Sequence, residues 1–429
     1  MDNNELFENA KGIFATSIFR NDCRLLFSVD KAIEYHFNDV ATQFYLTTIE
    51  SSSFDDAVQA IAEKYQVATS IIINDYAKFL GSFAVNRKTN GTSSMEDAQL
   101  EKKVPIDQLS APFSIEFELT KSCNFRCPFC YNTWKYTSDK PSRISHLPKD
   151  AIKRALLQCK ELGLFKVRYS GGEPTLYPYL SEIIEYASEL NFFQSIFTNA
   201  YNLNDETIAF WKAHKVNEVL ISLHGLKEQH ESITKVSGSF ESTCNNIMKL
   251  VNCGIHVIVE MTLVSSNLGE IDDVLIKVNE LGVSEFRIMK YVPNGVKDLD
   301  EQLSVSDEQF EKAIQSVYTN SLVINNIINV AFPCSQKFCS NGEVRADNSS
   351  ILYNCRAGIN WLAVSYEGNV KICPHSTKTF GNICDESASI IDMWNNGTKA
   401  EALAIIESRS QQCHECRSWD KCFGGCLLK

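Results

Sequence analysis

Three cysteines lie close together at Cys123, Cys127 and Cys130. Three thiolates in one tight loop can bind three irons of a cubane iron–sulfur cluster, which leaves the fourth iron without a protein ligand. An open iron can be chelated by the amino and carboxylate groups of a small substrate and can direct an electron into it. Zinc is the main alternative. It prefers four ligands, usually in C-x2-C pairs, and the three-residue gap between Cys123 and Cys127 fits that preference poorly.

A second set of cysteines occupies the C-terminal region. Its members are Cys355, Cys373, Cys413, Cys416, Cys422 and Cys426. The chain has 16 cysteines, a high count for the cytosol, where disulfides are disfavoured, so clustered cysteines predict metal binding or redox work. A zinc knuckle formed by the last four is an alternative, because their paired spacing suits zinc. Cys384 lies in an apolar run and is interpreted as structural.

Three short segments follow predicted strands and carry groups suited to binding a ligand. They are Ser170–Pro174 (SGGEP), Thr198–Ala200 and Ser222–Gly225. Glycines let the backbone approach a ligand closely, and carbonyls there, with Glu173, can accept hydrogen bonds from an ammonium group. The alternatives are a plain strand-to-helix turn for the first segment and loop residues that cap the next helix for the others.

The C-x3-C-x2-C spacing, with Phe129 before the last cysteine, resembles the signature of the radical S-adenosylmethionine (SAM) superfamily. This resemblance implies that Cys123, Cys127 and Cys130 hold a [4Fe–4S] cluster that cleaves SAM reductively. The 5′-deoxyadenosyl radical produced would then abstract a hydrogen atom from the substrate. The cofactor supplies this chemistry, and the protein must orient the substrate and exclude water.

The resemblance also implies a set of SAM-binding residues. The family's GGEP segment contacts the SAM amino group, and short polar groups at later strand ends contact its ribose and carboxylate. Carried over, the set is Phe129, Gly171, Gly172, Glu173, Pro174, Thr198, Asn199 and Ser222. Two positions depart from the family pattern: Ala200 stands where glycine is usual, and His224 where aspartate is common.

The C-terminal cysteines resemble the SPASM extension of radical SAM enzymes that act on peptides, which holds two auxiliary iron–sulfur clusters. The resemblance assigns Cys355, Cys373 and Cys426 to the nearer cluster, and Cys413, Cys416 and Cys422 to the farther one. The family's usual seventh cysteine is missing, since the sequence stops at Lys429. The fourth ligands therefore stay open; Cys334 or Cys339 could complete the nearer cluster.

The middle of the chain alternates strand and helix patterns, which predicts a parallel sheet with right-handed crossovers. The expected strands are 113–119, 165–169, 193–198, 218–223, 255–264 and 284–291, and the expected helices are 149–162, 178–190, 204–215, 240–253 and 269–281. Six strands are too few for a closed eight-stranded barrel, so we expect an α/β fold with a partial (β/α)6 barrel. Ligands gather at the carboxyl ends of such strands.

Composition divides the chain into five expected segments. They are a winged-helix-like domain at 1–86, a polar linker at 87–111, the partial barrel at 112–300, a bridging helix at 301–329, and a Cys-rich iron–sulfur domain at 330–429. The last segment has few long periodic stretches, apart from the helical pattern 390–408. We therefore expect metal ligation to stabilise it.

The first domain shows short β-prone runs at Ile13–Ile18 and Arg24–Val29, followed by helical patterns that begin near Asp39, Ser53 and Thr69. It resembles the leader-peptide recognition (PqqD-like) domains of enzymes that modify ribosomally made peptides. An exposed edge strand, expected at Arg24–Val29, would pair with an extended peptide. DNA binding by a winged helix is the alternative, but helix 70–83 offers only Lys78 as a cation.

The net charge of −12 argues against nucleic-acid binding, which needs a cationic surface. No apolar stretch reaches the length of a membrane span, and the first ten residues lack the pattern of a secretory signal. We therefore expect a cytoplasmic protein that binds neither nucleic acid nor membrane.

The combined reading is a radical SAM maturase that cross-links or oxidises a ribosomally made precursor peptide with a leader sequence. It would need an electron donor such as a flavodoxin or ferredoxin, and its cofactors would be SAM, the SAM-binding [4Fe–4S] cluster and one or two auxiliary [4Fe–4S] clusters. The alternatives are a maturase of whole proteins or a peptide epimerase with the same clusters, and a non-catalytic, zinc-bearing peptide-binding protein. The sequence leaves open the peptide, the bond formed, the residues that act on the substrate, and the oligomeric state.

Overall fold

The computed structural model describes residues 2–29, 33–84, 108–132, 146–293, 297–323, 329–331, 339–340, 343–344, 356–415, 419 and 426–427. The chain divides into two compact units, Met1–Ser110 and Ala111–Lys429. In the described part of the chain, no helix is both long and apolar enough to cross a membrane.

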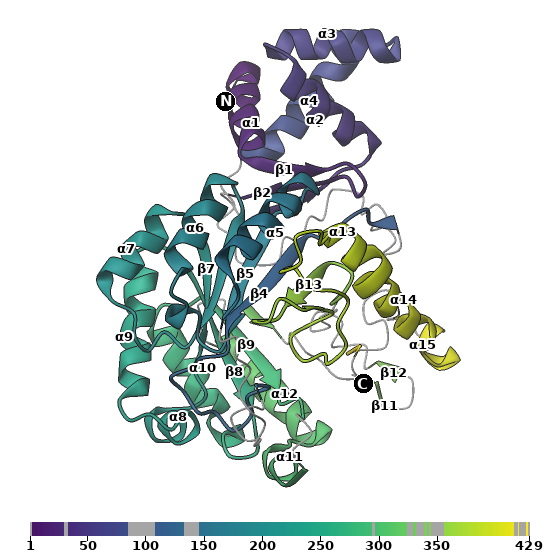
Figure 1. Cartoon of the computed structure of the whole chain (residues 1–429). Helices are drawn as coiled ribbons and strands as arrows, with labels where there is room; N and C mark the ends of the chain where they lie inside the picture. The colour runs from purple at the N-terminus through teal and green to yellow at the C-terminus, as the bar shows by residue number, and fades with distance from the viewer. Residues whose placement is uncertain are drawn as a thin grey trace. The chain divides into compact units, whose positions relative to one another are not determined.

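The first unit combines a three-stranded antiparallel sheet with four described helices (Figure 1). Their bounds are α1 Asn3–Ala15, β1 Ser17–Arg20, β2 Leu25–Ser28, β3 Ile33–His36, α2 Asp39–Glu50, α3 Phe54–Tyr65 and α4 Thr69–Ala84. The three later helices begin where the sequence predicts. Asn38 caps α2 and Ser53 caps α3, each accepting a hydrogen bond from a backbone amide in the first helical turn.

Two expectations for this unit are wrong. Residues 13–15 end helix α1 instead of opening a strand, because Asp2 and Glu5 form a capping box that starts a helix with Phe7, Ala10 and Phe14 buried. Arg24–Val29 is not an edge strand either. The sheet order β1-β2-β3 places β2 at the centre, so β1 and β3 form the two edges.

The second unit contains a nine-stranded sheet in the order β10-β9-β8-β7-β6-β5-β4-β13-β14. The six expected strands are present and parallel: β4 Ser114–Thr120, β5 Lys166–Gly171, β6 Phe193–Thr198, β7 Val216–Ser222, β8 His256–Leu263 and β9 Glu285–Lys290. Helices that connect them lie along one face of the sheet (Figure 1). They are α5 Lys149–Glu161, α6 Leu180–Glu189, α7 Asp205–Ala213, α8 Lys227–Thr234, α9 Ser239–Asn252 and α10 Ile271–Glu280.

Three further strands extend the sheet beyond the six that periodicity predicts. β10 Asn329–Ala331 pairs in parallel with β9, and β13 Trp361–Val364 pairs in parallel with β4. β14 Val370–Lys371 returns antiparallel to β13. The Cys-rich region is thus joined to the first barrel strand by backbone hydrogen bonds. The ring of His375, two residues after Cys373, contacts that of Tyr131 in the loop that follows β4.

The remaining elements of this unit are α11 Lys297–Leu303, α12 Asp307–Val323, β11 Cys339–Ser340, β12 Glu343–Val344, α13 Ile390–Met393, α14 Ala400–Glu407 and α15 Gln411–His414. The expected helical pattern 390–408 forms α13 and α14 with a π-helical turn, Trp394–Lys399, between them. Trp394 is buried and its Nε1 donates to the Ile359 carbonyl at 2.9 Å.

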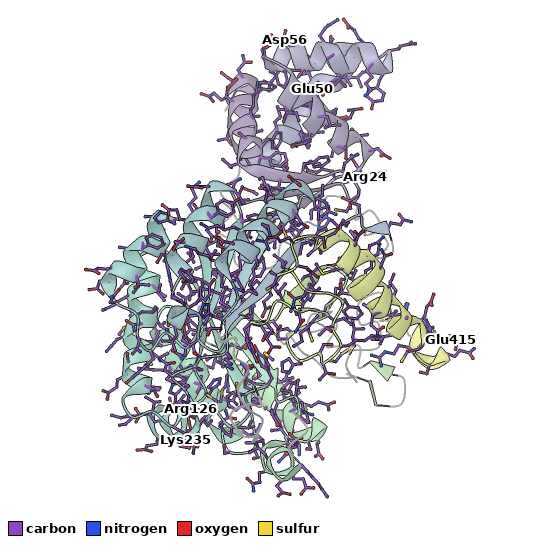
Figure 2. The ribbon with its side chains drawn as sticks, viewed as in Figure 1. Arg24, Glu50, Asp56, Arg126, Lys235 and Glu415 are labelled. Atoms are coloured by element: carbon purple, nitrogen blue, oxygen red, sulfur yellow. The ribbon has the colours of Figure 1, made fainter. Side chains whose placement is uncertain are left out.

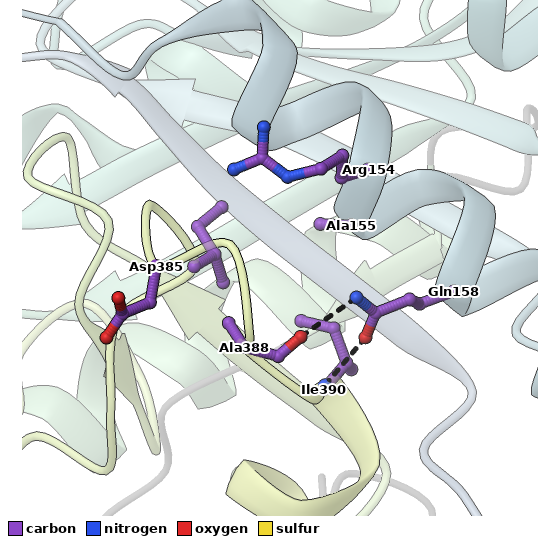
Figure 3. A pocket seen from close by; sticks show the side chains of 7 residues that line it. Arg154, Ala155, Gln158, Asp385, Ala388 and Ile390 are labelled. Atoms are coloured by element: carbon purple, nitrogen blue, oxygen red, sulfur yellow. Dashed lines mark hydrogen bonds between the residues drawn. The ribbon is translucent and has the colours of Figure 1, made fainter.

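An amide side chain also ties the barrel to the Cys-rich region. Gln158 of α5 donates from Nε2 to the Ala388 carbonyl at 3.0 Å, and its Oε1 accepts from the Ile390 amide at 2.9 Å. Figure 3 shows both bonds at the rim of a small cavity lined also by Arg154, Ala155 and Asp385. Because both polar atoms of Gln158 bond to backbone, it fixes the start of α13 against α5.

Candidate active site at the cysteine loop

The loop that carries Cys123, Cys127 and Cys130 leaves β4 and is held by hydrogen bonds of Arg126. Arg126 donates from Nη1 to the carbonyls of Cys123 at 2.6 Å and Phe125 at 2.9 Å. The Arg126 amide donates to the Thr234 carbonyl at the end of α8, at 2.9 Å. Figure 2 shows Arg126 beside Lys235, the residue after Thr234. The loop is therefore anchored to the far side of the barrel mouth.

An apolar cluster forms the floor of this loop. Phe125 and Cys127 are buried with Val264 and Tyr291, while Cys123, Phe129 and Cys130 are only partly buried against the same cluster. Among the described residues, no three His, Cys, Asp or Glu side chains lie close enough to bind one metal ion directly. A cubane cluster takes each thiolate on a different iron, so three cysteines on an apolar floor fit this group.

The Gly171–Gly172 pair packs directly on the backbone of the cysteine loop. The Gly172 amide donates to the Thr120 carbonyl at 2.6 Å, and the Glu173 amide donates to the Ser122 carbonyl at 2.8 Å. A Cβ at Gly172 would lie 2.1 Å from the Ser122 oxygen, and one at Gly171, where φ is +123°, would lie 2.6 Å from the Thr120 oxygen. Only glycine fits at either position, so the packing of the cysteine loop requires the motif.

Glu173 connects this motif to the end of β6. Its side chain is buried; Oε1 accepts from Thr198 Oγ1 at 2.6 Å and Thr175 Oγ1 at 2.8 Å, and Oε2 accepts from the Asn199 amide at 2.8 Å. Burial raises the pKa of the Glu173 carboxyl, and these donors counteract the rise. The carboxylate therefore holds two predicted SAM-binding segments together.

Asn199 extends the same network to the cysteine loop. Its Nδ2 donates to Asn124 Oδ1 at 2.7 Å, beside Cys123. Ala200, at the position where glycine is usual, adopts φ +54°, and Asn246 Nδ2 donates to its carbonyl at 2.8 Å. Alanine thus takes up a left-handed conformation here because buried hydrogen bonds hold the segment.

His224 lies next to the cysteine loop as well. Its ring meets Phe129 edge-on, with 4.7 Å between ring centroids, and its backbone amide donates to His230 Nδ1 at 3.1 Å. Burial lowers the pKa of His224 to about 3, so the imidazole is neutral at physiological pH. Ser222 ends β7 close by and is partly exposed.

The structure brings together the predicted residues of the first site: the cysteine loop, Gly171–Pro174, Thr198, Asn199 and Ser222 all lie at the carboxyl ends of β4 to β7. Of the six C-terminal cysteines, Cys373, Cys413 and Cys426 are described, and each is partly exposed. Cys355, Cys416 and Cys422 lie outside the described residues. The expected division into two auxiliary clusters therefore stays a prediction.

Sequence reasoning missed a row of charged side chains inside the barrel. Glu116 and Glu118 alternate along β4 with Ile115, Phe117 and Leu119, and all five are buried. Ser170 donates to Glu116 at 2.6 Å, and Tyr131 donates to Glu118 at 2.7 Å. The signal was available: carboxylates at alternate positions of a fully buried strand require an interior polar site.

Glu260 of β8 belongs to this interior, and it leads to a prediction about stability. Burial raises its pKa to about 7, although the Arg287 charge opposes the rise. An unfolded glutamate titrates near 4.3, so the folded protein holds this proton more tightly and loses stability as pH rises from about 5 to 8. We expect Glu260→Gln to stabilise the protein by about 1–3 kcal/mol more at pH 8 than at pH 5. Thermal unfolding at both pH values measures this difference; equal effects would contradict it.

Comparison with known proteins identifies both parts of the second unit. Residues 117–278 match the radical SAM superfamily, and residues 355–418 match the SPASM iron-sulfur cluster-binding domain. The chain is a radical SAM enzyme with a SPASM domain. Enzymes of this kind carry [4Fe–4S] clusters and bind SAM. When bound, SAM and its cluster supply a 5′-deoxyadenosyl radical that removes a hydrogen atom from the substrate.

Two curated relatives show how far the similarity of this radical SAM enzyme extends. The antilisterial bacteriocin subtilosin biosynthesis protein AlbA of Bacillus subtilis is 26% identical over 341 residues, which cover 75% of this chain and 69% of AlbA. The AdoMet-dependent heme synthase of Methanosarcina barkeri is 25% identical over 337 residues, covering 76% of this chain and 93% of that enzyme.

A solved structure resembles almost the whole fold of this radical SAM enzyme. Streptococcus suis SuiB bound to its precursor peptide SuiA aligns with a TM-score of 0.70 and 16% identity, over 96% of this chain and 95% of SuiB. At this level of identity the alignment shows a shared fold. It includes the described first unit, because coverage of 96% is larger than the second unit alone.

Proposed function

We propose that this radical SAM enzyme matures a precursor peptide: it cleaves SAM reductively and uses the radical to cross-link or oxidise residues of that peptide. The observation that carries the proposal is the hydrogen-bonded network that joins the cysteine loop, Gly171–Glu173 and the end of β6 at one barrel mouth. A site built this way suits a SAM-bound cluster, and the apolar floor under the loop excludes water.

Each predicted residue has a role in this proposal. Cys123, Cys127 and Cys130 would hold the cluster, with Phe129 packed beside it. Backbone carbonyls of Gly171 to Pro174 would accept hydrogen bonds from the SAM ammonium, while Glu173 keeps Thr198 and Asn199 in place for its ribose and carboxylate. Ser222 would complete this polar rim. Cys373, Cys413 and Cys426, with Cys355, Cys416 and Cys422, would hold the auxiliary clusters.

The first unit suits recognition of an extended peptide. Its small sheet has β1 and β3 as edges, and strand addition at either edge would satisfy backbone groups of a bound leader sequence. The likeness to SuiB, whose structure was solved with its precursor peptide, and to AlbA, a bacteriocin biosynthesis protein, supports a peptide substrate. An acidic chain with this unit is unsuited to DNA.

The proposal includes a small electron donor such as a flavodoxin or ferredoxin, because reductive cleavage of SAM consumes one electron per turnover. It also includes a cytoplasmic location, where reduced thiolates and clusters persist. A peptide epimerase, a whole-protein maturase and a zinc-bearing binding protein are separate outcomes of the test below.

The test uses chain purified without oxygen, a strong reductant, SAM and the short peptide encoded beside the gene. We expect about eight to twelve irons per chain, formation of 5′-deoxyadenosine, and a peptide that loses hydrogen mass as each new bond forms. Zinc in place of iron, or 5′-deoxyadenosine without any change in the peptide, would overturn the proposal. A peptide whose mass is unchanged in H2O but that carries one solvent deuterium at carbon after reaction in D2O would indicate an epimerase instead.

A further inference from the structure

Glu118 stands at the carboxyl end of β4, inside the barrel, where the mechanism above gives it no role. Its side chain is 4% exposed. Glu116, two residues earlier on the same face of β4, accepts a hydrogen bond from Ser170 of the neighbouring strand β5. Glu118 is therefore the interior carboxylate of β4 that lies nearest to the barrel mouth.

The two oxygens of Glu118 have different environments. Oε1 accepts the Tyr131 hydroxyl at 2.7 Å, a normal hydrogen bond. Oε2 lies 3.9 Å from Lys371 Nζ, which itself donates to the Pro374 carbonyl at 2.6 Å. The Tyr131 hydroxyl thus holds Oε1 in place. Oε2 faces the Lys371 ammonium, which is hydrogen-bonded to a backbone carbonyl, so Oε2 is able to accept a proton.

This group lies where the two cysteine regions of the second unit meet. Tyr131 directly follows Cys130 of the first cysteine loop. Its ring contacts His375, with 4.9 Å between ring centroids, and His375 is two residues from Cys373. Lys371 ends β14 on the same side. Glu118 and Tyr131 therefore lie between the cysteine loop and the start of the SPASM region.

The charges around Glu118 suit a group that exchanges protons. Burial raises its pKa to about 7, Lys371 and the Tyr131 hydroxyl oppose the rise, and Glu116 adds to it. Burial raises the pKa of Tyr366, on the loop between β13 and β14, and the charges of Glu367 and Glu118 add to the rise. A carboxyl group whose pKa lies near neutral pH is suited to act as a general base.

We propose that Glu118 is the general base that takes the proton released by the peptide when the new bond forms, and that Tyr131 positions it. This inference rests on the proposed function. Joining a C–H carbon to an X–H group removes two hydrogens. One leaves as an atom to the 5′-deoxyadenosyl radical and forms 5′-deoxyadenosine. The other leaves as a proton to Glu118, while its electron passes to an oxidised iron–sulfur cluster. The C–H and X–H bonds break and one C–X bond forms.

Three variants test this assignment. Glu118→Gln keeps the shape of the side chain and its bond to Tyr131 but cannot take the proton. Glu118→Asp keeps the carboxylate with a shorter reach. Glu116→Gln is the matched control, because it removes the neighbouring carboxylate on the same strand face, away from Tyr131.

We expect Glu118→Gln to raise the ratio of 5′-deoxyadenosine to modified peptide by about a hundredfold or more, the usual effect of losing a general base. Glu118→Asp should recover part of the coupling, and the acidic limb of the pH profile for modified peptide should disappear in Glu118→Gln. Glu116→Gln should keep the wild-type ratio and retain the acidic limb, moved to somewhat lower pH because the Glu116 charge no longer raises the Glu118 pKa. A Glu118→Gln ratio and pH profile equal to those of Glu116→Gln would overturn the inference.

Two measurements on the cluster-loaded protein, independent of turnover, complete the test. Infrared titration of wild type should show a protonated carboxylic acid that ionises near neutral pH and that Glu118→Gln lacks. Fluorescence anisotropy with labelled precursor peptide should give the same affinity for both chains, whereas a purely structural role for Glu118 would weaken binding and lower Tm. If the wild type modifies no peptide, the proposed function fails; if it does and Glu118→Gln matches it, this inference alone fails.

Discussion

Replacing Cys127 with serine is expected to abolish reductive cleavage of SAM. Cys127 is buried on the apolar floor between Phe125 and Phe129. No other thiolate can therefore enter from solvent and take its place as a cluster ligand. Because the cofactor carries the chemistry, we expect 5′-deoxyadenosine formation to fall by about a thousandfold or more. Iron should fall by about four per chain, one cubane cluster.

The matched control is Cys253→Ser. Cys253 ends α9 and is exposed, and none of the predicted cluster ligands lies near it in sequence. It should keep wild-type iron content and SAM cleavage. Iron analysis, electron paramagnetic resonance of the reduced protein and chromatography of 5′-deoxyadenosine measure the difference. Wild-type turnover by Cys127→Ser would contradict the assignment of the cluster to this loop.

Replacing Gly172 with alanine is expected to damage both folding and the SAM site. The added methyl would lie 2.1 Å from the Ser122 oxygen and 2.7 Å from the Lys121 oxygen, and backbone cannot yield as a flexible side chain does. We expect a loss of about 3 kcal/mol or more, at the upper end of overpacking effects, or displacement of the cysteine loop. Displacement would lower the bound iron and weaken SAM binding.

Gly269→Ala provides the control within the same unit, because no atom lies within 4 Å of the position that its Cβ would take. It should change Tm by little and leave iron content at the wild-type level. Thermal unfolding, iron analysis and SAM binding by calorimetry separate the two variants. If Gly172→Ala matched Gly269→Ala in all three, the close contact between Gly172 and the cysteine loop would not exist in solution.

The barrel core was predictable because its strands and helices alternate in chain order and each pairs with its neighbour in the sequence. The six expected strands all form, within a few residues of their expected bounds. The sheet nevertheless has nine strands, since β10, β13 and β14 are short. Strands of two to four residues carry too little periodicity to be recognised; β13 forms because β4 offers it an open edge.

The first unit shows the same limit. Helices α2 and α3 follow from their caps Asn38 and Ser53 and the apolar spacing after them, whereas β3 was not predicted. Because β3 was not predicted, Arg24–Val29 was expected to be an edge strand, whereas the edges of the sheet are β1 and β3. The identity of an edge is a property of pairing order, and strand propensity carries no information about pairing order.

The sequence by itself determined the chemistry of this protein: thiolate spacing, the Gly-Gly-Glu segment and the strand–helix alternation specified a SAM-cleaving site at one end of a parallel sheet. Local spacing suffices there because the three cysteines share one short loop. Only the tertiary structure decided which side chains surround the site. Glu118 meets Lys371 because β13 and β14 join the sheet beside β4, and Glu173 meets Asn199 because β5 and β6 are neighbours. Such contacts arise from long-range packing, which the short-range periodicity of a sequence does not encode.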